Sequence, residues 1–209
     1  DISSTGFDLD PETRTAARRR ELVDKVCESA VEAVAQADLI ILCVPVGAMG
    51  AAADAIADSL PKDAIISDVG SSKQSVMEAL AKALPGRNVI PAHPVAGTEQ
   101  SGPEAGFASL FTNRWCILTP PADADEHAIA RLSEFWTRLG ARVEVMDAAH
   151  HDLVLAVTSH IPHLIAFTIV GTASDLEDVT RSEVIKYSAG GFRDFTRIAA
   201  SDPVMWRDV

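Results

Sequence analysis

The chain has 209 residues, of which 47% are hydrophobic, enough for one core of ordinary size or for one domain plus a smaller one. Its formal net charge at pH 7 is −12. An acidic field of this size repels nucleic acid and anionic membrane surfaces, so we expect neither as a partner. The same field repels an anionic substrate, which would need a local cluster of basic side chains in order to bind.

The cysteines and the N-terminus indicate a cytoplasmic protein. Cys27, Cys43 and Cys116 lie far apart without a CxxC pair, as is typical of reduced, packed thiols. The N-terminus is polar and charged, so no signal peptide is expected. Between Asp152 and Asp175 lie 22 residues without Asp, Glu, Lys or Arg, which approaches the length of a membrane span. The histidines and threonines of this stretch are costly in hydrocarbon and favour a buried helix of a soluble core.

Short apolar runs alternate with amphipathic stretches over residues 1–147. Strands are expected at 1–8, 39–44, 64–69, 89–90, 115–118 and 142–145. Helices are expected at 12–25, 47–60, 72–84 and 126–139. The run 39–44 is apolar throughout, which suits a strand buried on both faces of a parallel sheet. The alternation predicts βαβ units and a Rossmann-like α/β domain with a doubly wound parallel sheet.

The pattern changes near Asp147. Residues 148–209 contain no further strand of this type and predict an all-helical domain. The stretch 151–173 is apolar around its whole circumference, which favours pairing of two subunits. Pro162 is expected to kink this helix or to end it early.

Asp8 is an acid at the end of the first expected strand. In a dinucleotide-binding fold, an acid at the end of the second strand binds the adenosine ribose hydroxyls and favours NAD over NADP. The alternative is a helix-capping or turn aspartate. The glycine-rich phosphate loop GxGxxG, which should precede such an acid, is absent. We therefore expect either that the first strand of the fold lies upstream of Asp1 or that the strand assignment is wrong.

The segment 89–106 begins as a strand and continues as a loop that carries His93. Ligands bind beyond the carboxyl ends of the strands in open α/β sheets, so His93 is a candidate general base with a pKa near neutrality. The alternative is a loop histidine bonded to the backbone.

Four segments carry a family resemblance. AHPVAGTEQSGPEAG at 92–106 resembles the HPxxGxExSG loop of the prephenate and arogenate dehydrogenases of tyrosine biosynthesis. Three others match that family in the same order: DVGSSK at 68–73, SHIPHLIAF at 159–167 and GGFRDFTRIAASDPVMWRD at 190–208. The resemblance covers nearly the whole chain from Asp8 onward. It implies NAD-dependent oxidative decarboxylation in a cytoplasmic homodimer.

For proton and hydride transfer, the resemblance implies that His93 contacts the substrate 4-hydroxyl. Ser71 would hold His93, the hydroxyl or the nicotinamide, or would cap the following helix. Asp8, Val44 and Pro45 would contact the cofactor. The neighbouring Lys73 is expected to be structural or solvent-facing.

For substrate binding, the resemblance implies that His160 and Arg197 contact prephenate, with Arg197 on a carboxylate. Arg193 lies four residues earlier and either contributes or forms a surface ion pair. Thr98 and Glu99 would approach the substrate or gate the cleft.

Other readings of the sequence remain open. Arogenate differs from prephenate only in its side chain, and the residues that read this difference are not identified. A β-hydroxyacid dehydrogenase would need a catalytic lysine, and the setting of Lys186, IKYSAGG, does not resemble that motif. A metal hydrolase could use His150, His151, His160 and His163, but no HExxH motif is present and no metal is expected. A non-catalytic binding module is a further alternative.

Overall fold

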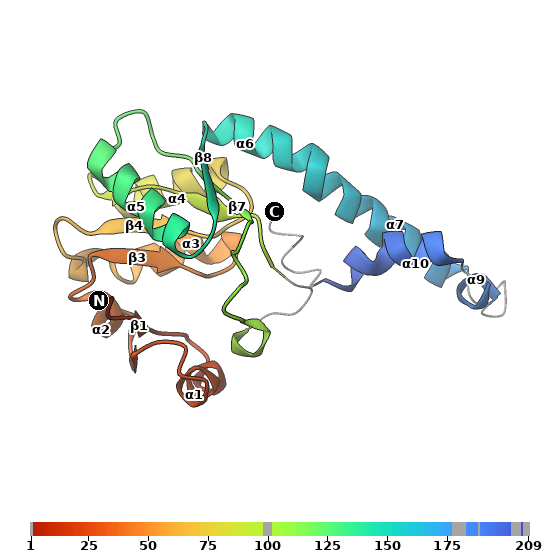
Figure 1. The fold of residues 1–209 in the computed structure, drawn as a ribbon, viewed down its shortest axis with the longest axis horizontal. Helices are drawn as coiled ribbons and strands as arrows, with labels where there is room; N and C mark the ends of the chain where they lie inside the picture. The colour runs from red at the N-terminus through yellow and green to blue at the C-terminus, as the bar shows by residue number, and fades with distance from the viewer. Residues whose placement is uncertain (1, 98–101, 177–182, 188, 202–205, 207–209) are drawn as a thin grey trace.

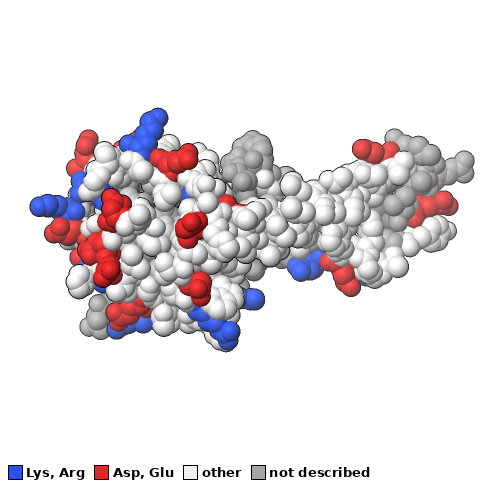
Figure 2. Space-filling model, turned by 90° about the horizontal axis from the view of Figure 1, so that it is seen from above, with Lys and Arg blue, Asp and Glu red and all other residues white. Residues whose placement is uncertain are grey.

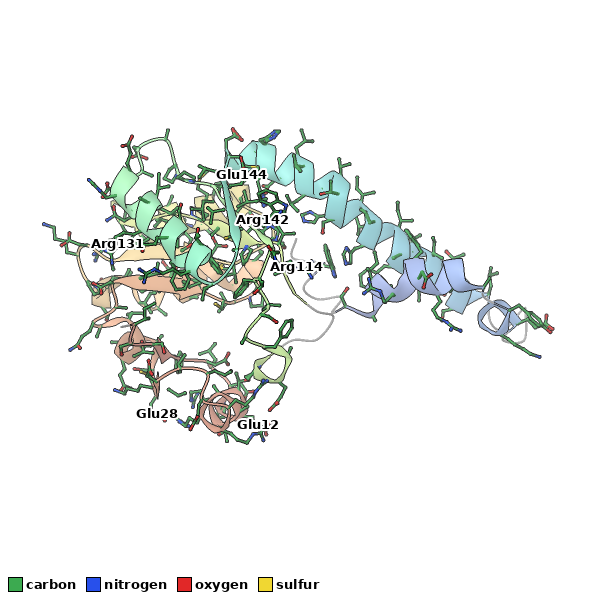
Figure 3. All side chains as sticks on the ribbon, viewed as in Figure 1. Glu12, Glu28, Arg114, Arg131, Arg142 and Glu144 are labelled. Carbon is green, nitrogen blue, oxygen red and sulfur yellow. The ribbon has the colours of Figure 1, made fainter. Side chains whose placement is uncertain are left out.

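The structure of the chain is a computed structural model that describes residues 2–97, 102–176, 183–187, 189–201 and 206 (Figure 1). The described residues up to Asp147 form an α/β body, and the helical segment from Ala148 onward extends away from it as a long arm (Figure 1 and Figure 3). Figure 2 shows charged side chains over the body and near the far end of the arm, with an uncharged stretch between them.

The described strands form three small sheets. They are β1 (Thr5–Gly6), β2 (Lys25–Val26), β3 (Leu39–Leu42), β4 (Ile65–Asp68), β5 (Asn88–Val89), β6 (Ala92–Pro94), β7 (Trp115–Leu118) and β8 (Arg142–Val145). The pairs β1–β2, β3–β4, β4–β5 and β7–β8 are parallel, whereas β6 and β7 are antiparallel. The segment 88–94 joins two sheets, because Ile90 N–H donates to the carbonyl of Ile66 at 2.8 Å and the carbonyl of Pro91 accepts from Thr119 at 2.9 Å.

Helices cover both faces of the β3–β4 pair. The helices are α1 (Pro11–Arg19), α2 (Ala30–Val34), α3 (Met49–Asp54), α4 (Gln74–Ala83), α5 (Glu126–Arg138), α6 (Ala148–Leu155), α7 (Ile161–Asp175), α9 (Glu183–Lys186) and α10 (Gly190–Thr196). Ile40 and Ile66 pack in one core with residues of α3 and α4. Ile41 and Ile65 belong to the opposite core, where Trp136 of α5 is 2% exposed. Successive strand residues thus face two buried layers, as in a parallel sheet covered by helices, and the expected α/β class is confirmed.

Three local expectations are wrong. The helix expected over 12–25 ends at Arg19, because Glu21 adopts a left-handed backbone with φ of 53°, and Lys25–Val26 form a strand. The strand expected over 1–8 is reduced to the two residues of β1. His93 is not in a loop but in β6, where it pairs with Ile117, because the antiparallel partner β7 continues the strand past Pro91.

The arm is one continuous helical segment made of α6, a π-helical turn over Ala156–His160, and α7. The expected break at Pro162 is wrong, because Pro162 falls in the first turn of α7, directly after the π-helical turn, where its missing N–H costs little. The expected burial is also wrong, since only 11% of the most apolar window is buried and Leu164 is 57% exposed. By length and composition alone, this helix also passes as a membrane span, a weak indication that core helices of soluble proteins share.

Candidate active site

A buried ion pair joins the ends of β4 and β6. The ammonium of Lys73 donates to the carboxylate of Asp68 and, at 2.7 Å, to the carbonyl of Ala92, and both charged side chains are fully buried. Asp68 also accepts the backbone N–H groups of Gly70 and Ala92 at 2.7 and 3.1 Å. Lys73 is therefore not solvent-facing. It fixes the turn that carries Ser71 against the strand that carries His93.

A chain of hydrogen bonds runs from His93 to a carboxylate on the arm. His93 Nδ1 lies 2.9 Å from His151 Nε2, and His151 Nδ1 lies 2.8 Å from Asp152 Oδ1. The two imidazole rings meet edge to face with an interplanar angle of 68°. The Asp152 carboxylate accepts the backbone N–H groups of Lys73 at 2.7 Å and Gln74 at 2.9 Å. Asp152 therefore caps α4 from another part of the chain and connects the arm to the α/β body.

Burial decides the charge state of these groups. Burial, together with the neighbouring His151 and Lys73, lowers the pKa of His93 to about 3, so a pKa near neutrality is not found. Burial also lowers the pKa of His151. Burial alone would raise the pKa of Asp152, but hydrogen bonds from the Gln74 and Lys73 N–H groups and from His151 outweigh it and lower that pKa. At neutral pH both histidines are neutral and Asp152 is ionised.

His160 supplies an uncommitted polar atom near His93. Within the described part of the chain, its Nε2 atom is buried and has no hydrogen-bond partner. The charge of His160 contributes to lowering the pKa of His93, so the two side chains influence the same site. The His160 ring meets Trp206 edge to face, and His163 stacks on Trp206 with 3.8 Å between ring centroids. A buried nitrogen without a partner is a natural contact for a ligand.

The basic candidates lie at the far part of the arm. Arg193 lies in α10 and Arg197 begins the 3-10 turn that follows it, and both are exposed. α10 packs against α7, the helix that begins directly after His160. This packing places the two arginines beside α7.

Thr98 and Glu99 lie outside the described residues. The chain that follows them is attached to α1. The guanidinium of Arg20 donates to the carbonyl oxygens of Pro103 and Gly106, the second at 2.8 Å. The loop between His93 and this attachment therefore has both ends fixed to the α/β body.

The turns after β3 and β4 can hold a dinucleotide. Val44 and Pro45 lie just beyond β3, after Cys43, at the edge where the parallel strands end. A Cβ at Gly70 would lie 3.0 Å from Asp68 Oδ2 and 3.2 Å from Val46 Cγ2, so a side chain at this position would require both neighbours to move by a few tenths of an ångström. Turns beyond the carboxyl ends of parallel strands are where a dinucleotide binds in a fold of this class.

Asp8 is exposed just after β1, as a ribose-binding acid would be. Its Oδ1 accepts the N–H of Asp10 at 2.8 Å, which is the contact expected of a turn aspartate.

Two family models match the chain. The first, the nucleotide-binding domain of prephenate dehydrogenase, covers residues 1–145, and the second, the dimerization domain of prephenate dehydrogenase, covers residues 147–209. The chain belongs to the prephenate dehydrogenase family. Its helical arm is thus the region that the family model describes as a dimerization domain.

Relatives of this prephenate dehydrogenase family member support the assignment. The cyclohexadienyl dehydrogenase of Zymomonas mobilis is 47% identical over 209 residues, which is 100% of this chain and 71% of the relative. The prephenate dehydrogenase of Bacillus subtilis is 35% identical over 206 residues, 98% of this chain and 55% of the relative. A crystal structure of Aquifex aeolicus prephenate dehydrogenase with hydroxyphenyl propionate and NAD+ has a TM-score of 0.91 at 34% identity and covers 100% of this chain and 72% of that one. The expected family, dehydrogenase activity and NAD cofactor are confirmed.

Sequence reasoning misses three members of the buried network: it assigns Asp68 no role, uses His151 only as a metal ligand, and uses Asp152 only to bound an uncharged stretch. Of the two roles expected for Lys73, structural and solvent-facing, the structural one is correct. The four candidate metal ligands do not gather, since no group of three or more His, Cys, Asp or Glu side chains suited to a metal occurs among the described residues. The adjacent pair His151-Asp152, at the start of the arm directly after the last strand, was the available signal.

Proposed function

We propose that this family member converts prephenate to 4-hydroxyphenylpyruvate and CO2, with NAD as the hydride acceptor. The observation that carries the proposal is His93, a buried and neutral imidazole at the junction of the α/β body and the arm. A neutral imidazole can accept the proton of the substrate 4-hydroxyl. When bound, the nicotinamide supplies the acceptor for the hydride that leaves C4.

Each step places a demand on the chain. His93 takes the hydroxyl proton as C4 becomes a carbonyl carbon. The bond from C1 to its carboxylate then breaks, its electron pair enters the ring, and the ring aromatises to a phenolate that regains a proton. Ser71, on the turn held by Lys73, orients His93 or the hydroxyl.

The substrate carries two carboxylates, and the arm supplies groups that suit them. We assign His160 and Arg197 to substrate binding, with Arg193 as a second cation, because the His160 Nε2 atom is buried without a partner in the described chain and guanidinium groups match carboxylates. Thr98 and Glu99 would line the loop over the substrate.

On the cofactor side, Asp8 would bind the ribose hydroxyls, with Val44, Pro45 and Ser71 along the dinucleotide. An acid at Asp8 favours NAD over NADP.

The assembly is proposed to be a cytoplasmic homodimer. We place the boundary between the α/β domain and the helical domain at residues 147 and 148. The apolar arm and the free thiols of Cys27, Cys43 and Cys116 support this proposal.

Absorbance at 340 nm tests the function in the full natural protein, with prephenate or arogenate and with NAD or NADP. We expect the absorbance to increase with prephenate and NAD, and we expect this increase to be lost in His93→Asn. An increase only with arogenate and NADP would reject both the proposed substrate and the proposed role of Asp8. If a folded protein gave no increase with any of the four combinations, the proposed reaction would be rejected in favour of a non-catalytic binding module.

A further inference from the structure

The donors and acceptors around Asp152 allow only one direction for the hydrogen-bond chain. Its carboxylate is ionised and already accepts two backbone N–H groups, so it can offer only acceptors to His151. His151 must therefore carry its proton on Nδ1 and donate it to Asp152 Oδ1 at 2.8 Å. Its Nε2 atom is then a lone-pair acceptor.

The same constraint passes to His93. The 2.9 Å contact between His93 Nδ1 and His151 Nε2 needs one hydrogen, and it comes from His93 because His151 has none to give there. A neutral imidazole has only one N–H, so His93 Nε2 is left with a free lone pair. This is the tautomer that can accept a hydroxyl proton.

The protonated form of His93 also depends on this series of hydrogen bonds. His93 lies close to the buried cation Lys73, and its pKa of about 3 shows how strongly the site disfavours a second positive charge. When His93 accepts a proton it becomes an imidazolium ion. Its Nδ1–H then points through His151 to the Asp152 carboxylate, which stabilises that charge.

We propose that His151 and Asp152 are positioning residues that fix the tautomer of His93 and stabilise its protonated form during the reaction. The inference rests on the proposed function, because it takes His93 as the proton acceptor. Asp152 belongs to the arm and also caps α4, so the capping contact and the tautomer of His93 depend on one carboxylate.

Three variants of the full natural protein separate this role from simple packing. His151→Gln keeps one acceptor and one donor on a planar group, whereas His151→Phe keeps the ring shape without either. Asp152→Asn removes the charge and can donate an N–H to His151, which reverses the direction of the hydrogen bonds from Asp152 to His93. His150→Gln is the matched control, because His150 is the exposed neighbour on the same helix.

We expect His151→Phe and Asp152→Asn to lower kcat by roughly 100-fold or more, with a much smaller change in KM, because His93 is then no longer held in the tautomer that can act as the general base. His151→Gln should retain roughly tenfold more activity than His151→Phe, and His150→Gln should behave as wild type. If His151→Phe is as active as wild type or exceeds His151→Gln, the role is packing and the proposal is overturned.

Nitrogen-15 NMR of histidine-labelled protein tests the tautomer without turnover. The signal that disappears in His93→Asn belongs to His93, and we expect it to report a protonated Nδ1 and a bare Nε2 in wild type. We expect the reverse in Asp152→Asn. A wild-type His93 protonated on Nε2 would overturn the inference. If the protein gave the expected NMR result but were inactive on prephenate, the proposed function would be rejected. The tautomer of His93 set by His151 and Asp152 would still be supported.

Discussion

Lys73 and Asp68 form an ion pair in which neither side chain has exposed surface, and Asp68 also accepts the N–H of Gly70 in the turn that carries Ser71. Two backbone N–H groups and one carbonyl complete the bonding of these charges. Because a buried charge is tolerated only while it is paired, this contact connects the stability of the fold to the geometry of the site.

Removing one partner of this pair should be severely destabilising. We expect Lys73→Met to lower the free energy of unfolding by about 3–5 kcal/mol, because it leaves Asp68 as a buried, unpaired carboxylate. Urea denaturation measures this change. Glu134→Ala, which breaks the exposed pair with Arg138, is the control and should cost less than about 1 kcal/mol. A Lys73→Met protein as stable as that control would contradict the pairing.

A side chain at Gly70 should be destabilising. In Gly70→Ala the new Cβ would meet Asp68 Oδ2, which Lys73 holds in place, and Val46 Cγ2. We expect a loss of about 1–3 kcal/mol in stability from this overpacking and a higher KM for NAD, because the displaced turn lies at the cofactor edge. Gly50→Ala is the matched control, since its Cβ would meet Ala79 at an ordinary 3.7 Å. Equal effects of the two substitutions would show that the turn can adapt.

Much of the fold followed from local pattern. The apolar run 39–44 and the stripe of 126–139 predicted β3 and α5, because burial on one or two faces leaves a periodicity that can be read along the chain. The place of His93 next to a strand was also readable. Its position inside β6 was not, because that strand exists through pairing with β7, more than 20 residues away.

The buried network could not be read in the same way. Asp152 and Lys73 are 79 positions apart. The sequence around neither residue indicates that the Asp152 carboxylate caps α4. The exposure of α6 and α7 was hidden for a related reason. An apolar sequence states that a surface must be covered, but it does not state whether the same chain or a second subunit covers it.

Stability should fall in mild acid because His93 stays neutral when folded. Its pKa of about 3 in the folded state lies below the unfolded value of 6.5, so between these limits the unfolded chain binds the proton that the folded chain excludes. Falling pH therefore lowers the free energy of unfolding by up to about 1.4 kcal/mol per pH unit from this residue. The groups that face His93 are His151, His160, Lys73 and Asp152.

Urea denaturation of wild type and His93→Gln between pH 5 and 6.5 isolates this contribution. Asp152 does not interfere in this range, because its lowered pKa removes stability only below about pH 4. The wild-type curve should rise more steeply with pH than the variant curve. Parallel curves would show that His93 titrates normally in the folded protein.

The apolar arm should hold two subunits together. Leu164 in α7 is 57% exposed in the single chain, on a helix of which most of the apolar surface is uncovered. Leu164→Glu would place an unpaired carboxylate in the subunit contact, at a cost of roughly 3 kcal/mol or more, which raises the dimer Kd by at least about 100-fold. Leu22→Glu is the control, because Leu22 is 45% exposed on the α/β body. Sedimentation over a range of concentrations should find Leu164→Glu monomeric where wild type and the control are dimeric. A dimeric Leu164→Glu protein would place the subunit contact elsewhere.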